Sequence, residues 1–295
     1  ISGGLVGSEM CIRDRINIVG AKNEVVSFNI ILEAGNQPAG NITVELDSLI
    51  NPNGHSINYQ YATGEGLFDW VGRNIELFYI RYLEIRGLSR LGYENYDERH
   101  IPDRFQRPYN EFGGGIGVWE DRPDANKMYP DIAVPLELEQ GFTIDSGTNQ
   151  SIWVDIYIPK DAENSYYQGT VVVKENGTTT YEIPIELGVW DFMLPDEPSG
   201  KTMLFISYND INTRYGGVPY PNLGEPADSL GRVARERHFL MAHRHKIPLI
   251  DGNDGPTIWT HDRPQDYWIP ALDGSMFTAA NGYDGPGVGI TNAYI

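Results

Sequence analysis

Apolar and polar side chains alternate along several short runs between residues 16 and 193, and this alternation restricts the possible folds most strongly. A period of two places every second side chain on the same face of a β-strand. The apolar faces of two such runs are Val26, Phe28, Ile30 and Leu32, and Ile152, Val154, Ile156 and Ile158. Strands are predicted at residues 25–32, 42–46, 75–85, 151–158, 170–174 and 180–189. Short strands that bury one face are typical of a β-sandwich.

A hairpin is predicted where Glu175, Asn176 and Gly177 separate two of these runs. Asn and Gly adopt the positive φ angles of a tight turn with little strain. In the second arm, Pro184 lies opposite the apolar face, and because proline has no N–H to donate, this strand is expected at a sheet edge. We therefore expect residues 16–195 to form an all-β sandwich of the immunoglobulin-like or jelly-roll type.

The composition agrees with a folded, turn-rich β-protein and excludes several functions. The chain of 295 residues contains 33 Gly, 19 Pro and 12% aromatic residues, which suits two domains rich in turns. A net charge of -19 repels nucleic acid and anionic lipid, so neither is an expected partner. No apolar run approaches the roughly 18 residues of a membrane span. Cys11 is the single cysteine, which excludes an intrachain disulfide.

After a proline-containing linker at residues 196–200, the pattern changes from successive strands to strand, helix, strand. Strands are predicted at residues 202–207 and 247–250, and a helix capped by Asp228 or Ser229 is predicted to run to about His245. The expected apolar stripe of this helix consists of Leu230, Val233, Ala234, Leu240 and Met241. This unit is typical of an α/β barrel of the TIM type.

Both ends of the chain are expected to be artificial. Residues 201–295 are far fewer than the roughly 250 of a complete barrel, so we expect a truncated barrel with one long loop after Gly252. Residues 1–15 resemble translated sequencing adapter and are expected to lie outside the fold as an unstructured leader. A long aromatic segment at about residues 87–131 is expected to form a packed excursion without regular structure.

Polar and aromatic residues follow the two predicted barrel strands, where the catalytic loops of such barrels begin. Tyr208, Asn209 and Asp210 follow the first strand, and Asp251, Asn253, Asp254, Trp259 and Trp268 follow the second. Aromatic rings stack on the C–H faces of sugars, and carboxylates and amides bind sugar hydroxyls. These residues are candidate substrate contacts. A simple turn at residues 251–255, and aromatic side chains that pack the loop against the sandwich, stay open as alternatives.

Three motifs that could indicate a metal or cofactor do not have the required geometry. On a helix, His243 points nearly opposite His238, and His245 lies about 10 Å along the axis from His238, too far to share one zinc ion. We expect these histidines to be solvated or to compensate the helix dipole. Residues 251–262 lack the final Glu of a calcium loop, and the glycine run at residues 113–117 lacks a following Lys-Ser/Thr. No metal and no cofactor are predicted.

Several segments, taken in order, resemble bacterial proteins related to glycoside hydrolase family 123. The segments lie at residues 21–28, 128–136, 151–159, 167–171 and 189–195, and include Met128-Tyr129-Pro130-Asp131 and Val189-Trp190-Asp191-Phe192. The resemblance implies an N-terminal β-sandwich packed on a (β/α)₈ barrel. It also implies removal of N-acetylgalactosamine-type residues, in which an Asp orients the sugar's acetamido group and an adjacent Glu donates a proton. That pair is expected beyond Ile295, so no catalytic residue is assigned in this chain.

The resemblance leads to an expected function for the intact protein. We expect a secreted bacterial glycoside hydrolase of metagenomic origin, extracellular or periplasmic, that acts on N-acetylhexosamine-containing glycans, with the fragment itself inactive. The alternative is a non-catalytic sandwich that binds a glycan or a protein beside a degenerate barrel. In a third interpretation, the sandwich only shields and stabilises the barrel.

Overall fold

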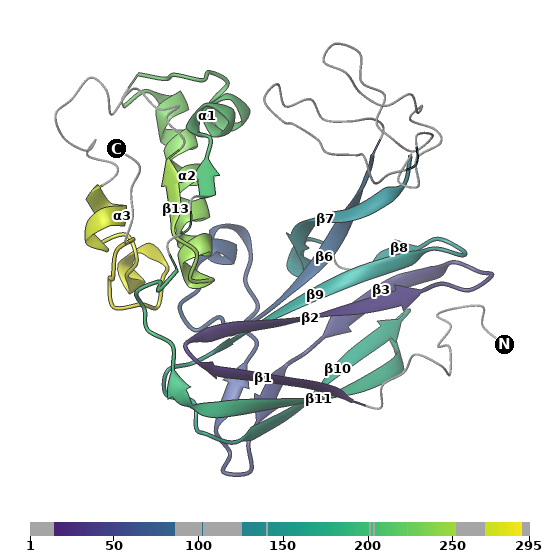
Figure 1. Ribbon diagram of the computed structural model, residues 1–295. Helices are drawn as coiled ribbons and strands as arrows, with labels where there is room; N and C mark the ends of the chain where they lie inside the picture. The colour runs from purple at the N-terminus through teal and green to yellow at the C-terminus, as the bar shows by residue number, and fades with distance from the viewer. Residues whose placement is uncertain are drawn as a thin grey trace.

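The computed structural model describes residues 15–85, 102, 126–139, 141–200, 202, 204–222, 224–251 and 269–290. These residues form two curled β-sheets and a group of helices packed beside one end of the sheets (Figure 1). Residues 1–14 of the expected leader, most of the segment at residues 87–131 and residues 252–268 lie outside the described residues. Arg15, the last residue of the expected leader, forms an ion pair with Glu186.

The larger sheet has seven strands in the order β1-β11-β10-β3-β8, with β4 paired to β10 and β5 paired to β4. Its strands are β1 (Ile16–Lys22), β3 (Ala39–Glu45), β4 (Ser48–Ile50), β5 (Ser56–Asn58), β8 (Phe142–Ile144), β10 (Tyr166–Glu175) and β11 (Thr178–Met193). The smaller sheet has the order β2-β9-β6-β7. It contains β2 (Glu24–Glu33), β6 (Ile75–Glu84), β7 (Met128–Pro135) and β9 (Asn149–Ile158).

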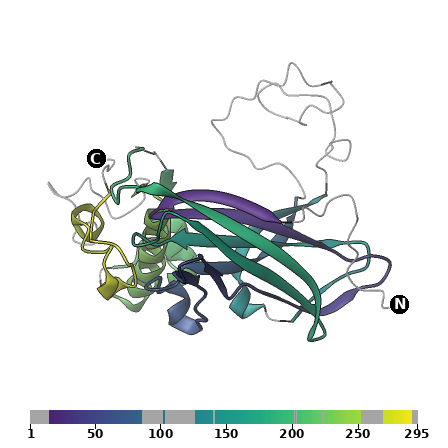
Figure 2. The same cartoon turned by 90° about the horizontal axis from the view of Figure 1, so that it is seen from below.

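The apolar faces of the two sheets enclose one core, the arrangement of a β-sandwich (Figure 2). On β9, Ile152, Val154, Ile156 and Ile158 are fully buried, as their alternation predicts. Val171 and Val173 of β10 and Leu187 of β11 are fully buried in the same core from the other sheet. Burial of apolar surface stabilises such a core by about 25 cal/mol per Å².

The predicted hairpin joins β10 to β11. Asn176 and Gly177 have φ angles of 52° and 78°, the left-handed conformations that the turn requires. The edge position predicted from Pro184 is correct only for the first half of β11. β1 pairs in parallel with β11 from Ile185 onward, and within the described residues nothing pairs with that side of Pro184. Proline, which has no N–H to donate, therefore lies directly before the first residue of β11 that pairs with β1.

Strand β7 was not predicted. It begins at Met128, inside the segment expected to lack regular structure, and pairs antiparallel with β6. Its first six residues, 128–133, are exposed on both faces. The sequence therefore has no alternation of apolar and polar residues that would have predicted this strand. A two-residue period arises only where one face is buried.

The helical region contains the predicted strand, helix, strand unit. β12 (Leu204–Ile206) and β13 (Leu249–Asp251) form a parallel two-stranded sheet, with α1 (Tyr208–Gly216) and α2 (Pro226–Arg244) between them in the chain. The described residues contain these two parallel strands and no closed barrel. Residues 269–290, expected as part of one long loop, instead form α3 (Ile269–Asp273) and a 3₁₀-helix, η6 (Ala279–Asn281).

The helix α1 and the start of α2 differ from the prediction, whereas α2 ends at Arg244, close to the predicted His245. Helix α1 was expected as a loop, but Ser207 caps it by accepting a hydrogen bond from the N–H of Asp210, and Gly217 ends it with a φ angle of 80°. Helix α2 begins at Pro226, before the predicted caps Asp228 and Ser229. Proline is favoured at the first position of a helix because its fixed φ angle suits the helix and no N–H is needed there.

The predicted apolar stripe of α2 is mostly wrong. Ala234 and Leu240 are buried, but Leu230, Val233 and Met241 are 57%, 43% and 49% exposed. The buried face includes Asp228, Arg235, His243 and Arg244 instead. Polar side chains are buried there because they find partners: Arg235 lies 3.6 Å from Asp228 and 4.7 Å from the ring centroid of Tyr208.

Arg244, at the last position of α2, joins the helices to the sandwich. Its Nη2 donates a hydrogen bond of 2.6 Å to the carbonyl oxygen of Arg73, and its Nη1 donates one of 3.3 Å to Asp284. The guanidinium carbon lies 4.3 Å from the ring centroid of Tyr157 on β9. A guanidinium that is 2% exposed is stable only with such partners.

The predicted linker is also held in place. The carboxylate of Asp196 accepts hydrogen bonds from Asn23 at 3.0 Å and from Lys160 at 2.9 Å, and Lys246 lies 3.9 Å away. The linker therefore contacts the turn between β1 and β2 and residues that follow β9 and α2. The division into domains at residues 16–195, 196–200 and 201–295 stays a prediction.

We predict that Arg244→Ala lowers the free energy of unfolding by about 3 kcal/mol, because it leaves the Arg73 carbonyl and the Tyr157 ring without their buried partner. Arg214→Ala, at an exposed position on α1, serves as the matched control and should change it by less than about 0.5 kcal/mol. Urea unfolding followed by tryptophan fluorescence measures both. Equal effects of the two substitutions would show that Arg244 does not hold the junction.

Candidate functional site

The carboxyl ends of β12 and β13 lie at one edge of their parallel pair. Ile206 is paired with Asp251, so the two strands end side by side. In open parallel sheets, ligands bind at this edge. The structure brings the segment that contains Tyr208, Asn209 and Asp210 close to Asp251, and their role in binding stays a prediction.

The three residues after β12 differ in what they offer a ligand. Tyr208 is 3% exposed, and its ring packs in the core of the helical region under Arg235. Asn209 donates a hydrogen bond of 2.8 Å from Nδ2 to the hydroxyl of Tyr220. Asp210 is exposed on the first turn of α1. A sugar at this edge would therefore meet Asn209 and Asp210 rather than the buried ring of Tyr208.

The other predicted contacts are not placed. Asn253, Asp254, Trp259 and Trp268, like the glycine run at residues 113–117, lie outside the described residues, and the side chain of Asp251 is not described.

The three histidines of α2 and its C-cap contact three different partners. His238 Nδ1 lies 2.7 Å from the carbonyl oxygen of Ala234, and His245 Nε2 lies 3.7 Å from Asp155 on β9. His243 stacks on Phe277 with 3.7 Å between ring centroids and is 1% exposed, so the expectation of solvated histidines is wrong for His243. Among the described residues, no three His, Cys, Asp or Glu side chains are grouped as metal ligands.

A cleft of about 540 Å³ separates the 3₁₀-helix η1 (Gly64–Phe68) from α2 and residues 270–282. Arg237 spans it, with an ion pair to Glu65 and its guanidinium carbon 3.7 Å from the ring centroid of Phe68. Glu236 lines the same cleft, and burial raises the pKa of its carboxyl group although Arg232 and Arg235 oppose the shift. A carboxyl group of raised pKa in a cleft is suited to hold or donate a proton.

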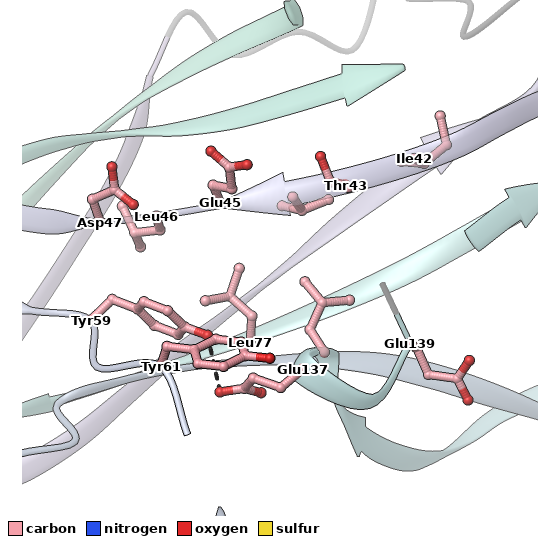
Figure 3. Close-up of a pocket in the computed structure, with 12 residues that line it drawn as sticks. Ile42, Thr43, Glu45, Leu46, Asp47, Tyr59, Tyr61, Leu77, Glu137 and Glu139 are labelled. Atoms are coloured by element: carbon pink, nitrogen blue, oxygen red, sulfur yellow. Dashed lines mark hydrogen bonds between the residues drawn. The ribbon is translucent and has the colours of Figure 1, made fainter. Parts of the chain in front are cut away.

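A second cavity, of about 260 Å³, lies within the sandwich between β3 and the 3₁₀-helix η4 (Leu136–Leu138) (Figure 3). Ile42, Val44, Leu46, Leu77 and Leu136 give it an apolar lining, and its polar lining is Thr43, Glu45, Asp47, Tyr59, Tyr61, Glu137 and Glu139. We did not predict this pocket, because its residues come from four separate segments. The sequence feature that could have indicated this pocket is the spacing of Tyr59 and Tyr61, and of Glu137 and Glu139, which are two residues apart in each case.

Glu137 is the most constrained side chain in this pocket. It is 2% exposed, and its Oε1 accepts hydrogen bonds of 3.0 Å from the Tyr59 hydroxyl and from Arg73 Nη2. Its Oε2 is buried and has no partner among the described residues. Burial, together with the negative charge of Glu137, raises the pKa of Tyr59, so the tyrosine stays a hydrogen-bond donor. A buried acceptor without a donor costs about 1–3 kcal/mol.

Comparisons with known proteins support the fold. No protein-family model and no curated protein sequence matches the chain. The structure of a family 123 glycoside hydrolase from Clostridium perfringens, studied for hydrolysis of glycolipid glycans, superposes with a TM-score of 0.54 at 16% identity, over 80% of this chain and 33% of that chain. This chain thus spans about a third of the length of that enzyme. At this low identity, the likeness concerns the fold alone.

Two further structures resemble parts of the chain. A PapD-like domain of human CEP192 aligns with a TM-score of 0.25 at 8% identity over 64% of this chain and 96% of that one. AvmM, which catalyses macrocyclization in alchivemycin A biosynthesis, aligns with a TM-score of 0.28 at 9% identity over 69% of this chain and 94% of that one. Scores this low carry no argument about fold or function. Within the described residues, no helix is both long enough and apolar enough to cross a membrane.

We predict that His243 makes the folded state less stable in acid. Burial lowers its pKa to about 4, against roughly 6.5 in the unfolded chain. The unfolded state therefore binds more protons as the pH falls from 6.5 to 4, and over that window stability decreases by up to about 3 kcal/mol.

Urea unfolding between pH 7 and pH 4 tests this contribution by comparing the wild type with His243→Asn, which cannot gain a proton. His245, whose pKa burial also lowers, is present in both proteins, so the difference between them isolates His243. Parallel pH profiles for the two proteins would contradict the prediction.

Proposed function

We propose that this chain is the N-terminal part of a glycoside hydrolase that acts on N-acetylhexosamine-containing glycans. The observation that carries the proposal is the superposition on a family 123 enzyme, which includes 80% of this chain. The ordered segments that resemble this family in the sequence support it independently. Fold likeness alone does not define an activity, so the proposal depends on the site as well.

In the proposed protein, the β12–β13 pair begins a (β/α)₈ barrel whose substrate binds at the carboxyl ends of the strands. Asn209, Asp210 and Asp251 would contribute polar contacts from the first two loops, and Asn253, Asp254, Trp259 and Trp268 would complete them. An Asp–Glu pair beyond Ile295 would orient the acetamido group and protonate the leaving oxygen. The sandwich (residues 16–195), the linker (196–200) and the barrel portion (201–295) would form the domains of a secreted or periplasmic enzyme.

We predict that the full-length protein releases sugar from a chromogenic N-acetylhexosaminide, while the 295-residue chain does not. In the full-length protein, Asp210→Asn should reduce kcat/KM at least tenfold, because it removes an exposed carboxylate from the proposed substrate edge. The exposed Arg214→Ala is the matched control and should retain full activity. Absence of sugar release from every N-acetylhexosamine-containing glycan tested would refute the enzyme proposal.

A second function is favoured by the pocket within the sandwich: a glycan-binding protein whose barrel has no activity. The two proposals differ in one feature, an adjacent Asp-Glu at the end of a middle barrel strand. If the second proposal holds, the full-length protein is retarded by immobilised glycan in affinity electrophoresis and hydrolyses none of it. Hydrolysis that requires the Asp–Glu pair would reject this alternative.

A further inference from the structure

The pocket between β3 and η4 has apolar and polar side chains on both of its sides. Val44, Leu46 and Leu77, which are at most 5% exposed, belong to its apolar lining. Figure 3 shows Tyr59 and Tyr61 together on the side opposite β3, with the carboxylate of Glu137 and the side chain of Leu77 beside them. A volume of about 260 Å³ is smaller than the usual range for drug-sized ligands and suits a single small ring.

The buried Oε2 of Glu137 shows which chemical group the pocket lacks. It is a hydrogen-bond acceptor with no donor among the described residues, whereas nearly all buried polar groups in folded proteins have a partner. Arg73 lies 3.0 Å from the other oxygen of Glu137 and also 3.6 Å from Glu76, so one guanidinium serves two carboxyl groups. We take the missing partner to be a hydroxyl group, because a hydroxyl can donate the hydrogen bond without the cost of removing a second cation from water.

The other acidic residues of the pocket lead to the same conclusion. Glu45 is paired with Lys174 at 2.6 Å and Glu139 with Arg81 at 3.0 Å. Asp47 is exposed at the rim, where solvent screens its charge. The pocket thus presents many acceptor oxygens, and three of its four carboxylates already have a basic partner, which favours a neutral polyhydroxylated ligand over an organic cation.

Tyr61 gives the pocket a ring at its mouth. It is 57% exposed, and its hydroxyl forms no hydrogen bond with the described residues. Sugar rings place their C–H faces on exposed aromatic rings, while their hydroxyls bond to carboxylates. Tyr61 and Glu137 together supply both kinds of contact.

We propose that this pocket binds one neutral sugar residue, with a ring face on Tyr61 and a hydroxyl donating to Glu137. The site is distinct from the β12–β13 edge, and it goes beyond the proposed function because it does not require the barrel to be catalytic. It would anchor one residue of a glycan on the sandwich while the rest of the glycan extends out of the pocket.

The test uses the 295-residue chain, so its result does not depend on hydrolysis by the intact protein. Isothermal titration calorimetry with N-acetylgalactosamine, galactose and glucose as probes should detect one site for at least one of them. Tyr61→Ala should weaken that binding at least tenfold. Tyr166→Ala, which removes a comparably exposed tyrosine (64%) on the outer face of β10, is the matched control and should leave binding unchanged.

A second variant tests the hydrogen bond. Glu137→Gln keeps the side-chain shape but replaces one acceptor oxygen with a donor, and it should weaken binding at least fivefold. Thermal unfolding of the variant shows whether it folds, and because Tyr61 is exposed, Tyr61→Ala tests the site even if Glu137→Gln does not fold.

Three results would overturn the proposal. The first is the absence of binding by all three sugars. The second is sugar binding that Tyr61→Ala leaves unchanged. The third is equal or tighter binding of butylammonium that Tyr61→Ala abolishes, which would make the pocket a cation site.

Discussion

Two buried arginines, the first of which donates a hydrogen bond to the backbone of the second, link the helices to the sheets and to the sandwich pocket. Arg244 of α2 donates to the carbonyl oxygen of Arg73, and the side chain of Arg73 donates to the carbonyl oxygen of Leu67 and to Glu137. Each guanidinium is at most 3% exposed, so each must keep its partners to remain stable. One chain of contacts therefore runs from the end of α2 to the pocket between the sheets.

Strands of the sandwich were predictable because apolar and polar residues alternate along the sequence, a local pattern that needs no knowledge of distant partners. On β9 the alternating residues Ile152 to Ile158 share the core face, although Ser151, Asp155 and Tyr157 on the other face are buried as well. Asn176 and Gly177 provide the tight turn of the hairpin. The parallel pairing of β1 with β11 and the exposed strand β7 were not predictable in this way. Their positions depend on neighbouring strands far away in the sequence rather than on local alternation.

The helical region was less predictable, because its buried face is partly polar. Hydropathy predicted Leu230, Val233 and Met241 on the buried face of α2, whereas the structure buries Arg235, His243 and Arg244. The burial of Arg244 depends on Arg73, Tyr157 and Asp284, none of which adjoins it in the sequence. The candidate edge was predictable from the order of β12 and β13. The burial of Tyr208 and the existence of the pocket follow only from tertiary packing.

The strong acidity of the chain does not decide what the pocket binds. A net charge of -19 attracts cations over long distances, but at physiological ionic strength this attraction is screened beyond about 8 Å. Within the pocket, the ion pairs of Glu137 with Arg73 and of Glu45 with Lys174 determine the local charge. A cation that enters would have to compete with Arg73 and Lys174, which are already in place, whereas a hydroxyl group can donate to the unpaired oxygen of Glu137. The short-range pairing therefore supports the proposed neutral ligand although the whole molecule is acidic.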